Sequence, residues 1–328
     1  MNPAAEERPA DSTPAQDEGR EVPHGVNPPT LGGWLVFTLA RPLIWLLGAL
    51  PLRLALGGAR LAADVLFALR LFRGVALSNL EYVFPEKSAK ERKRIAWLAN
   101  RSMFQMVVEF IAYLNPKRKA LDNVEIENLD AVAGAVAQGR GILLIVAHSS
   151  NLDITGRAWT ELGYEAQAVV KPLKGYYWNE LLLRCRAANG YGVISTKSPD
   201  AVSQINAVIA RGGAVGLFPD QNARKRGIVC DFMGKPASTY KGPAATYIEL
   251  NPVILVAVNS RPHSDHRHLL RLRILEDIPL SGDREQDLLA VTKQINDTMS
   301  EFLLLDPTAY MWAHRRWGRF RDGTWVAG

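Results

Sequence analysis

Cysteine is scarce in this 328-residue chain, and the motifs that depend on it are missing. Its two cysteines, Cys185 and Cys230, provide no disulfide framework or zinc site and fit structural thiols in a reducing compartment. No second histidine lies near enough to His148 to suggest a metal site. The glycine patterns that bind phosphate and the G-x-S-x-G turn of serine hydrolases are also absent. We therefore expect chemistry that uses no metal, no other cofactor and no protein nucleophile.

A long uncharged hydrophobic run is absent as well. The two longest runs, 31–40 and 42–52, are separated by Arg41, and each falls short of the roughly 20 residues that a spanning helix needs. Joining them would make a marginal span that contains Pro42. We expect residues 31–72 to form helices that associate with a membrane, preferably by lying in its surface. One true span and a buried pair of helices are the alternatives.

Acidic residues are concentrated at the start of the chain. The formal charge is +6, yet residues 1–30 carry −4, so the other 298 residues carry +10. A basic body fits an anionic partner: nucleic acid, an acidic protein or a phospholipid surface. Residues 1–30 are rich in proline, alanine and acids and lack apolar periodicity, which predicts a disordered tail. A folded domain is expected over 73–328, after the membrane-associating segment at 31–72.

Short apolar segments alternate with helical ones from about residue 128. Strands are expected at 141–147, 165–170, 191–196, 214–218, 228–232, 253–258 and 268–275. Helices are expected at 88–114, 129–139, 152–162, 175–188, 199–211 and from about 285. The first of these helices begins with a capping-box pattern, Ser88 to Glu91, and the fifth has Pro199 at its first position. This alternation predicts an α/β fold with a mostly parallel, mixed sheet flanked by helices.

Two of the expected strands run into polar residues at their carboxyl ends, where such sheets bind ligands. The strand at 141–147 leads into His148 and Asp153, and the strand at 214–218 leads into Asp220. A neutral imidazole is a natural base for an alcohol near neutral pH, and a neighbouring carboxylate fixes its tautomer. We expect Asp153 to fold back against His148, although a capping histidine and a first-turn aspartate would give the same spacing. The pair favours a substrate hydroxyl as the nucleophile.

These residues carry a resemblance to known enzymes. The segment from His148 to Asp153 resembles the H-x4-D/E block of the glycerolipid acyltransferase superfamily, and 218–220 lies where that superfamily has F-P-E. Further segments resemble one branch, the late acyltransferases of lipid A biosynthesis of the lauroyl or myristoyl type. They are, in the family's order, 79–81, 84–86, 219–221, 232–239, 242–244 and 310–317. The resemblance spans roughly residues 35–320.

The resemblance implies an acyltransferase domain over 73–328 at the cytoplasmic face of the inner membrane. It would move a fatty acyl chain from acyl carrier protein, or acyl-CoA, to a hydroxyl of a lipid A precursor, with His148 as general base and Asp153 orienting it. Many members carry Glu where this chain has Asp153, and the family's middle basic position is matched only loosely. The alternatives are another glycolipid such as a phosphatidylinositol mannoside, a thioesterase-like hydrolase, and a membrane-binding protein without activity.

Several polar residues are candidates for binding the substrates. Backbone N–H groups after Ser149 or a nearby cation would stabilise the oxyanion. A cationic loop at 224–226 suits sugar-linked phosphates, and the aromatic and basic block at 310–321 suits an anionic membrane better than nucleic acid, which is not expected as a partner. The candidates are Lys171, Arg184, Lys197, Asp220, Arg224, Arg226, Arg315 and Arg316.

Overall fold

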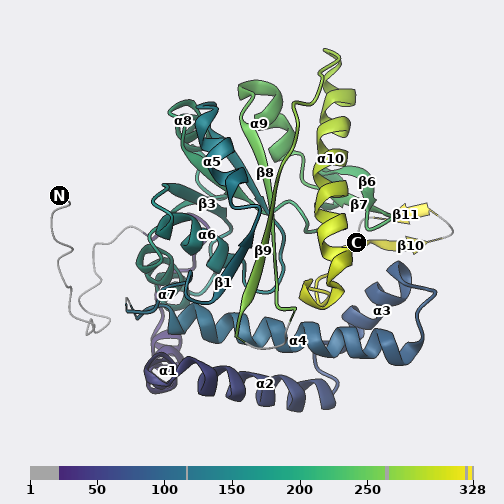
Figure 1. Cartoon of the computed structure of the whole chain (residues 1–328). Coiled ribbons are helices and arrows are strands. Elements are labelled where there is room, and N and C mark those ends of the chain that lie inside the picture. The colour runs from purple at the N-terminus through teal and green to yellow at the C-terminus, as the bar shows by residue number, and fades with distance from the viewer. Residues whose placement is uncertain (1–21, 116, 263–265, 322–323, 327–328) are drawn as a thin grey trace.

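A seven-stranded sheet forms the centre of the molecule (Figure 1). This computed structural model describes residues 22–115, 117–262, 266–321 and 324–326. The sheet order is β1-β9-β8-β2-β5-β3-β4, and every neighbouring pair is parallel except β8 and β9. The strands are β1 Val124–Glu127, β2 Ile142–Val146, β3 Ala166–Val170, β4 Gly192–Ser195, β5 Ala214–Leu217, β8 Val253–Ser260 and β9 His268–Ile274. The predicted α/β fold with a mostly parallel sheet is confirmed.

Helices cover both faces of this sheet (Figure 1). The helices of the described chain are α1 Leu31–Ala49, α2 Leu52–Ala68, α3 Arg73–Val83, α4 Ala89–Ala112, α5 Asp130–Ala137, α6 Leu152–Glu161, α7 Tyr176–Ala188, α8 Ala201–Ala210, α9 Gly242–Leu250 and α10 Arg284–Leu305. Successive residues of β2 alternate between two cores: Leu143 and Ile145 pack with α10, whereas Leu144 and Val146 pack with α5 and α6. Burial on both faces explains why the central strands are continuous apolar runs.

The strand predicted at 228–232 exists but lies outside the main sheet. It is β6, Ile228–Phe232, and it pairs with β7, Lys235–Thr239, as an antiparallel hairpin. The turn residues Met233 and Gly234 both have positive φ, the conformation that two-residue hairpin turns of type I′ need. The sequence analysis also missed β1 and α9, which are short. Helix α8 begins at Ala201, so Pro199 precedes it instead of opening it.

The segment at 31–72 forms α1 and α2, which lie with α4 below the sheet in the view of Figure 1. Helix α4 carries the predicted capping box: Ser88 Oγ accepts from Glu91 N–H, and the Glu91 carboxylate accepts from Ser88 N–H at 2.8 Å. Among the described residues, α1 is the one helix long and apolar enough to cross a membrane. One of its sides is partly covered, since Phe37 packs on Tyr177 and Trp178 of α7.

The described part of the chain begins before residue 31. Residues 1–21 of the expected acidic tail lie outside the described residues. Residues 22–30 follow a defined path: Val26 is buried, and Asn27 N–H donates to the carbonyl of Lys174 at 2.7 Å. Residues of the expected tail just before 31 thus pack against the loop after β3, and the boundary that we placed at residue 30 coincides with the start of α1.

Candidate active site

The carboxyl ends of β2 and β5 bring His148 and Asp220 together. The two strands are parallel neighbours, so the residues that follow them meet at one edge of the sheet. His148 Nδ1 lies 2.7 Å from Asp220 Oδ1, and the backbone N–H of His148 donates to Asp220 Oδ2 at 2.8 Å. Both carboxylate oxygens are thus committed to one residue. Because Asp220 accepts at Nδ1, the neutral imidazole carries its free lone pair on Nε2, where a substrate proton can be taken.

The charge of Asp220 governs the protonation of this imidazole. Burial lowers the pKa of His148, but the charge of Asp220, its hydrogen bond and the more distant charge of Asp153 outweigh burial and raise that pKa above its ordinary value. Burial in turn raises the pKa of Asp220, yet its interactions with His148 and the charge of Arg316 bring that pKa below its ordinary value. The pair is therefore suited to hold a proton on the imidazole after a substrate hydroxyl has lost it.

The backbone around Asp220 is held from the C-terminal segment. Asp220 is fully buried, and its backbone carbonyl accepts a hydrogen bond from Tyr310 OH at 3.1 Å. Arg316 is fully buried too, and its guanidinium donates to the carbonyls of Gln221 and Ser238 and to Thr239 Oγ1. Arg316 and Asp220, both expected to bind substrate, are thus placed inside the protein, where they support the site.

Asp153 does not lie where the sequence analysis expected it. Helix α6 starts at Leu152, and Asn151 caps it by accepting from Asp153 N–H at 3.1 Å. This places the Asp153 side chain against α7 and β4: its Oδ1 accepts from Arg186 Nε at 3.1 Å and from Tyr191 OH. No hydrogen bond joins Asp153 to His148 in the described part of the chain. The expected contact is therefore replaced by the one from Asp220, and Asp153 adds only a longer-range charge.

Three site residues were missed by the sequence analysis. Gln221 Nε2 lies 3.1 Å from His148 Nε2, on the side of the ring opposite Asp220. The next residue, Asn222, donates its backbone N–H to His314 Nε2 at 3.1 Å. Burial is the main reason why the pKa of His314 lies below its ordinary value, so this second imidazole is neutral near pH 7. Their positions directly after Asp220 could have suggested Gln221 and Asn222, whereas His314 is distant in sequence.

A buried ionic cluster fixes the turn between His148 and α6. Glu109 of α4 is fully buried and accepts from Arg261, from His268 Nε2 at 3.0 Å and from Asn151 Nδ2 at 2.9 Å. The backbone carbonyl of Asn151 accepts from Asn259 Nδ2 at 2.9 Å. Burial raises the pKa of Glu109, but Arg261 and His268 outweigh it and bring the pKa well below its ordinary value. The cluster therefore remains charged and ties α4, β8 and β9 to the turn that follows His148.

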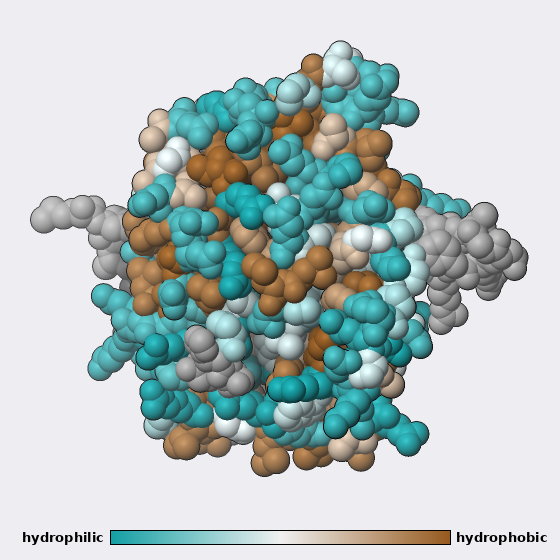
Figure 2. All heavy atoms as spheres, turned by 45° about the vertical axis from the view of Figure 1, so that its right-hand side comes forward, coloured by the Kyte–Doolittle hydropathy of each residue, from teal (hydrophilic) through white to brown (hydrophobic). Residues whose placement is uncertain are grey.

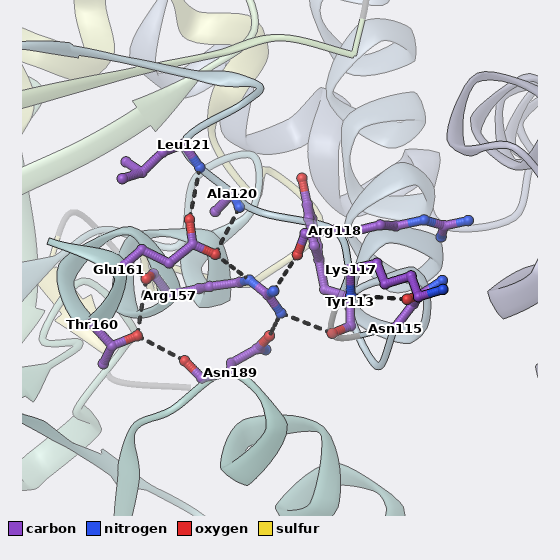
Figure 3. A network of polar contacts seen from close by, with 10 residues as sticks. All are labelled: Tyr113, Asn115, Lys117, Arg118, Ala120, Leu121, Arg157, Thr160, Glu161 and Asn189. Carbon is purple, nitrogen blue, oxygen red and sulfur yellow. Dashed lines mark hydrogen bonds and ion pairs between the residues drawn. The ribbon is translucent and has the colours of Figure 1, made fainter. Parts of the chain in front are cut away.

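The far end of α6 is anchored by a second network (Figure 3). Arg157 donates to the carbonyls of Tyr113 and Arg118 and to Asn189 Oδ1, and it pairs with Glu161 at 2.7 Å. Glu161 also accepts the backbone N–H groups of residues 120 and 121. The helix that follows His148 is thus fixed at both ends, which limits how far the site can rearrange.

Two apolar hollows lie near His148, and one of them is lined by it. One is lined by Met103 and Met106 of α4, by His148 itself and by Tyr310, and it continues toward Phe72 through Ala99 and Trp312. The other lies beneath α6 and is lined by apolar residues of β2 and β3, with Asp153, Arg186 and Phe218 at its wall. The ring of Phe218 lies 5.6 Å from that of His148, centre to centre.

Most of the predicted cations surround this edge of the sheet. Lys171 follows β3, Lys197 follows β4, and residues 224–226 follow β5 as a 3-10 turn, all exposed. Arg315 is exposed beside His314, and Arg184 is exposed on α7. The described residues include no cluster of histidine, cysteine and acidic side chains able to hold a metal ion.

Comparisons with known proteins agree over most of the chain. Residues 28–319 match the family described as bacterial lipid A biosynthesis acyltransferase. A lipid A biosynthesis palmitoleoyltransferase of Escherichia coli K12 is 25% identical over 280 residues, which cover 84% of this chain and 88% of that protein. A lipid A biosynthesis lauroyltransferase of the same organism is 25% identical over 295 residues, covering 88% and 90%. A lipid A biosynthesis acyltransferase of Shigella flexneri matches as closely as the first.

Proposed function

The chain belongs to the bacterial lipid A biosynthesis acyltransferase family, and from this premise we propose that it transfers a fatty acyl chain from acyl carrier protein to a hydroxyl of a lipid A precursor. The activity class, acyl transfer in lipid A biosynthesis, matches the names of its relatives. The donor, the catalytic base and the membrane surface are our proposals. The contact of 2.7 Å between His148 Nδ1 and Asp220 Oδ1 carries the mechanism.

His148 is the general base in this mechanism. Its Nε2 takes the proton of the lipid hydroxyl while the hydroxyl oxygen attacks the thioester carbonyl. Asp220 stabilises the resulting imidazolium through Nδ1. When the tetrahedral intermediate collapses, the C–S bond breaks, the new ester remains on the lipid, and the leaving thiolate takes the proton from His148. The two side chains used in these steps, His148 and Asp220, follow β2 and β5 at the same edge of the sheet.

The remaining site residues have supporting roles in this proposal. Asp153 pairs with Arg186 and so positions that guanidinium beside the hollow under α6. Exposed Lys171, Lys197 and the cationic turn at 224–226 suit the phosphates of a glycolipid. The two apolar hollows suit acyl chains, since one runs from His148 along apolar side chains of α4 and the other lies under α6 beside Phe218, whose ring neighbours that of His148.

We place the enzyme at the cytoplasmic face of the inner membrane, held by α1 and α2. Both helices expose large apolar side chains: Leu31, Leu35, Val36, Leu39, Leu43, Trp45, Leu46, Leu54, Leu61 and Val65. Figure 2 shows hydrophobic side chains along the lower edge of the molecule, where these helices lie in Figure 1. An exposed apolar face of this size fits a membrane surface. Because α1 is partly covered on one side by α7, we favour a helix that lies in the surface over one that crosses the bilayer.

An acyl-transfer assay on purified membranes tests this function. Labelled acyl carrier protein is offered with a Kdo-bearing tetraacyl lipid A precursor to the wild type, to His148→Ala and to the exposed control Lys293→Ala. We expect an added acyl chain with the wild type and the control and none with His148→Ala. Free fatty acid that forms independently of the lipid would indicate a hydrolase. An intact donor without transfer would indicate another glycolipid as the substrate.

A further inference from the structure

Both ring nitrogens of His148 have side-chain partners in the structure. Asp220 Oδ1 accepts a hydrogen bond from Nδ1, so a neutral ring carries its lone pair on Nε2. The carboxamide nitrogen of Gln221 lies 3.1 Å from that Nε2 and donates to it. The amide therefore stands where a lipid hydroxyl must come if His148 is to take its proton.

The backbone around Gln221 is fixed, whereas its side chain can turn away. The carbonyl of Gln221 accepts from Arg316 at 3.3 Å, and the preceding Asp220 is fully buried. The following Asn222 donates its backbone N–H to His314 and its side chain to the carbonyl of Arg315. The Gln221 side chain itself is only half-buried. It can leave Nε2 by rotating its own torsions, with no movement of the strand ends.

We propose that Gln221 is a positioning residue that occupies the proton-accepting nitrogen of His148 until a lipid hydroxyl displaces it, and so keeps the base from activating water. The inference rests on the proposed function of His148. It assigns Gln221 a task that the transfer reaction requires, because water is always more abundant than the lipid.

The reaction that Gln221 suppresses is hydrolysis of the donor. Water at Nε2 would lose a proton to His148 while its oxygen attacked the thioester carbonyl. Collapse of the intermediate would break the C–S bond, release the fatty acid, and return the proton from His148 to the thiolate. A small, mobile water must displace the amide with one hydrogen bond, whereas a lipid held by its chains and phosphates brings its hydroxyl to the same place with far more binding energy.

Truncating the side chain of Gln221 to a methyl group tests this role. For Gln221→Ala, free fatty acid and acylated lipid are measured from one labelled thioester, with and without the lipid precursor. We expect the ratio of hydrolysis to transfer to rise about tenfold, the effect of losing one hydrogen bond of ordinary strength. Gln204→Ala is the matched control, since Gln204 bonds Asp200 on α8, away from the site. Its ratio should equal that of the wild type.

A merely structural role for Gln221 would lower transfer and hydrolysis together and leave their ratio unchanged, and that result would overturn the proposal. If Gln221→Ala does not fold, Gln221→Asn provides the same test, because its shorter amide should reach Nε2 poorly and raise the ratio to a smaller extent.

A spectroscopic measurement separates this inference from the proposed function. The ¹⁵N resonance of His148 Nε2 is recorded in the free enzyme at a pH where the ring is neutral. A shift between the wild type and Gln221→Ala would support the hydrogen bond even if the wild type transferred no acyl chain to the precursor. Identical resonances would refute it even if transfer were normal.

Discussion

Asp220 Oδ1 lies 2.7 Å from His148 Nδ1, although 72 residues separate the two in the chain. Five residues after His148, Asp153 has a carboxylate that faces Arg186 and Tyr191 instead. The orientation of the His148 imidazole is therefore set across two neighbouring strands and not within one turn. The two aspartates therefore have different contacts, and substituting each of them distinguishes their effects on the rate.

Asp220→Asn should lower kcat by about 10³- to 10⁴-fold, because an amide can no longer stabilise the imidazolium and can favour the wrong tautomer. Asp153→Asn should lower kcat much less, since it loosens Arg186 and leaves the contact of His148 with Asp220 in place. Steady-state rates at saturating substrate compare the two. A larger loss for Asp153→Asn would return the orienting role to that residue.

The pH profile of kcat/KM should fall on the acid side of a midpoint above 6.5. His148 acts as a base only when it is neutral, and the charge of Asp220 raises the pKa of His148 above its ordinary value. Activity should therefore fall about tenfold per pH unit below that pKa. In Asp220→Asn the raising charge is gone, so the residual activity should have its acid limb at lower pH. An acid limb that stays in place would mean that another group titrates.

The sequence predicted most of the fold because burial leaves a clear pattern. The apolar runs at 141–147 and 253–258 correspond to β2 and β8, which are buried on both faces. The capping box at Ser88 predicted the start of α4 for a different reason: its hydrogen bonds join residues that are close in the sequence. Short elements such as β1 and α9 escaped because four to nine residues give little periodicity. The strand at 228–232 was expected in the main sheet but pairs with β7 instead, because tertiary packing determines which strands pair.

The sequence indicated the main residues of the site but not which of them are in contact. His148 and Asp220 were both expected at strand ends, but their contact depends on β2 and β5 being neighbours, which spacing along the chain does not reveal. Arg316 was expected to bind substrate, since an arginine is seldom fully buried. Its burial depends on carbonyls of Gln221 and Ser238 that the fold brings around it.

Glu109→Ala should destabilise the protein by about 3–5 kcal/mol, because it leaves Arg261 and His268 buried without their shared carboxylate. Urea unfolding, followed by circular dichroism, measures the change. The control is Glu301→Ala, which removes an exposed ion pair with Arg273 and should cost about 1 kcal/mol or less. Equal losses in the two variants would show that the buried cluster adds no stability of its own.

Leu39→Glu combined with Leu61→Glu should release the enzyme from membranes if α1 and α2 lie in the membrane surface. Both leucines are exposed, at 81% and 67%. Burying each side chain in lipid stabilises membrane binding by roughly 1.5–3 kcal/mol, and a carboxylate in its place loses this contribution. Flotation with anionic vesicles should show partitioning reduced by at least about tenfold. Leu305→Glu, at the end of α10, is the control, because this leucine is exposed to 67% on a different helix. Equal flotation of the double variant and the control would place the membrane contact elsewhere, and residues 310–321 would be the next segment to substitute.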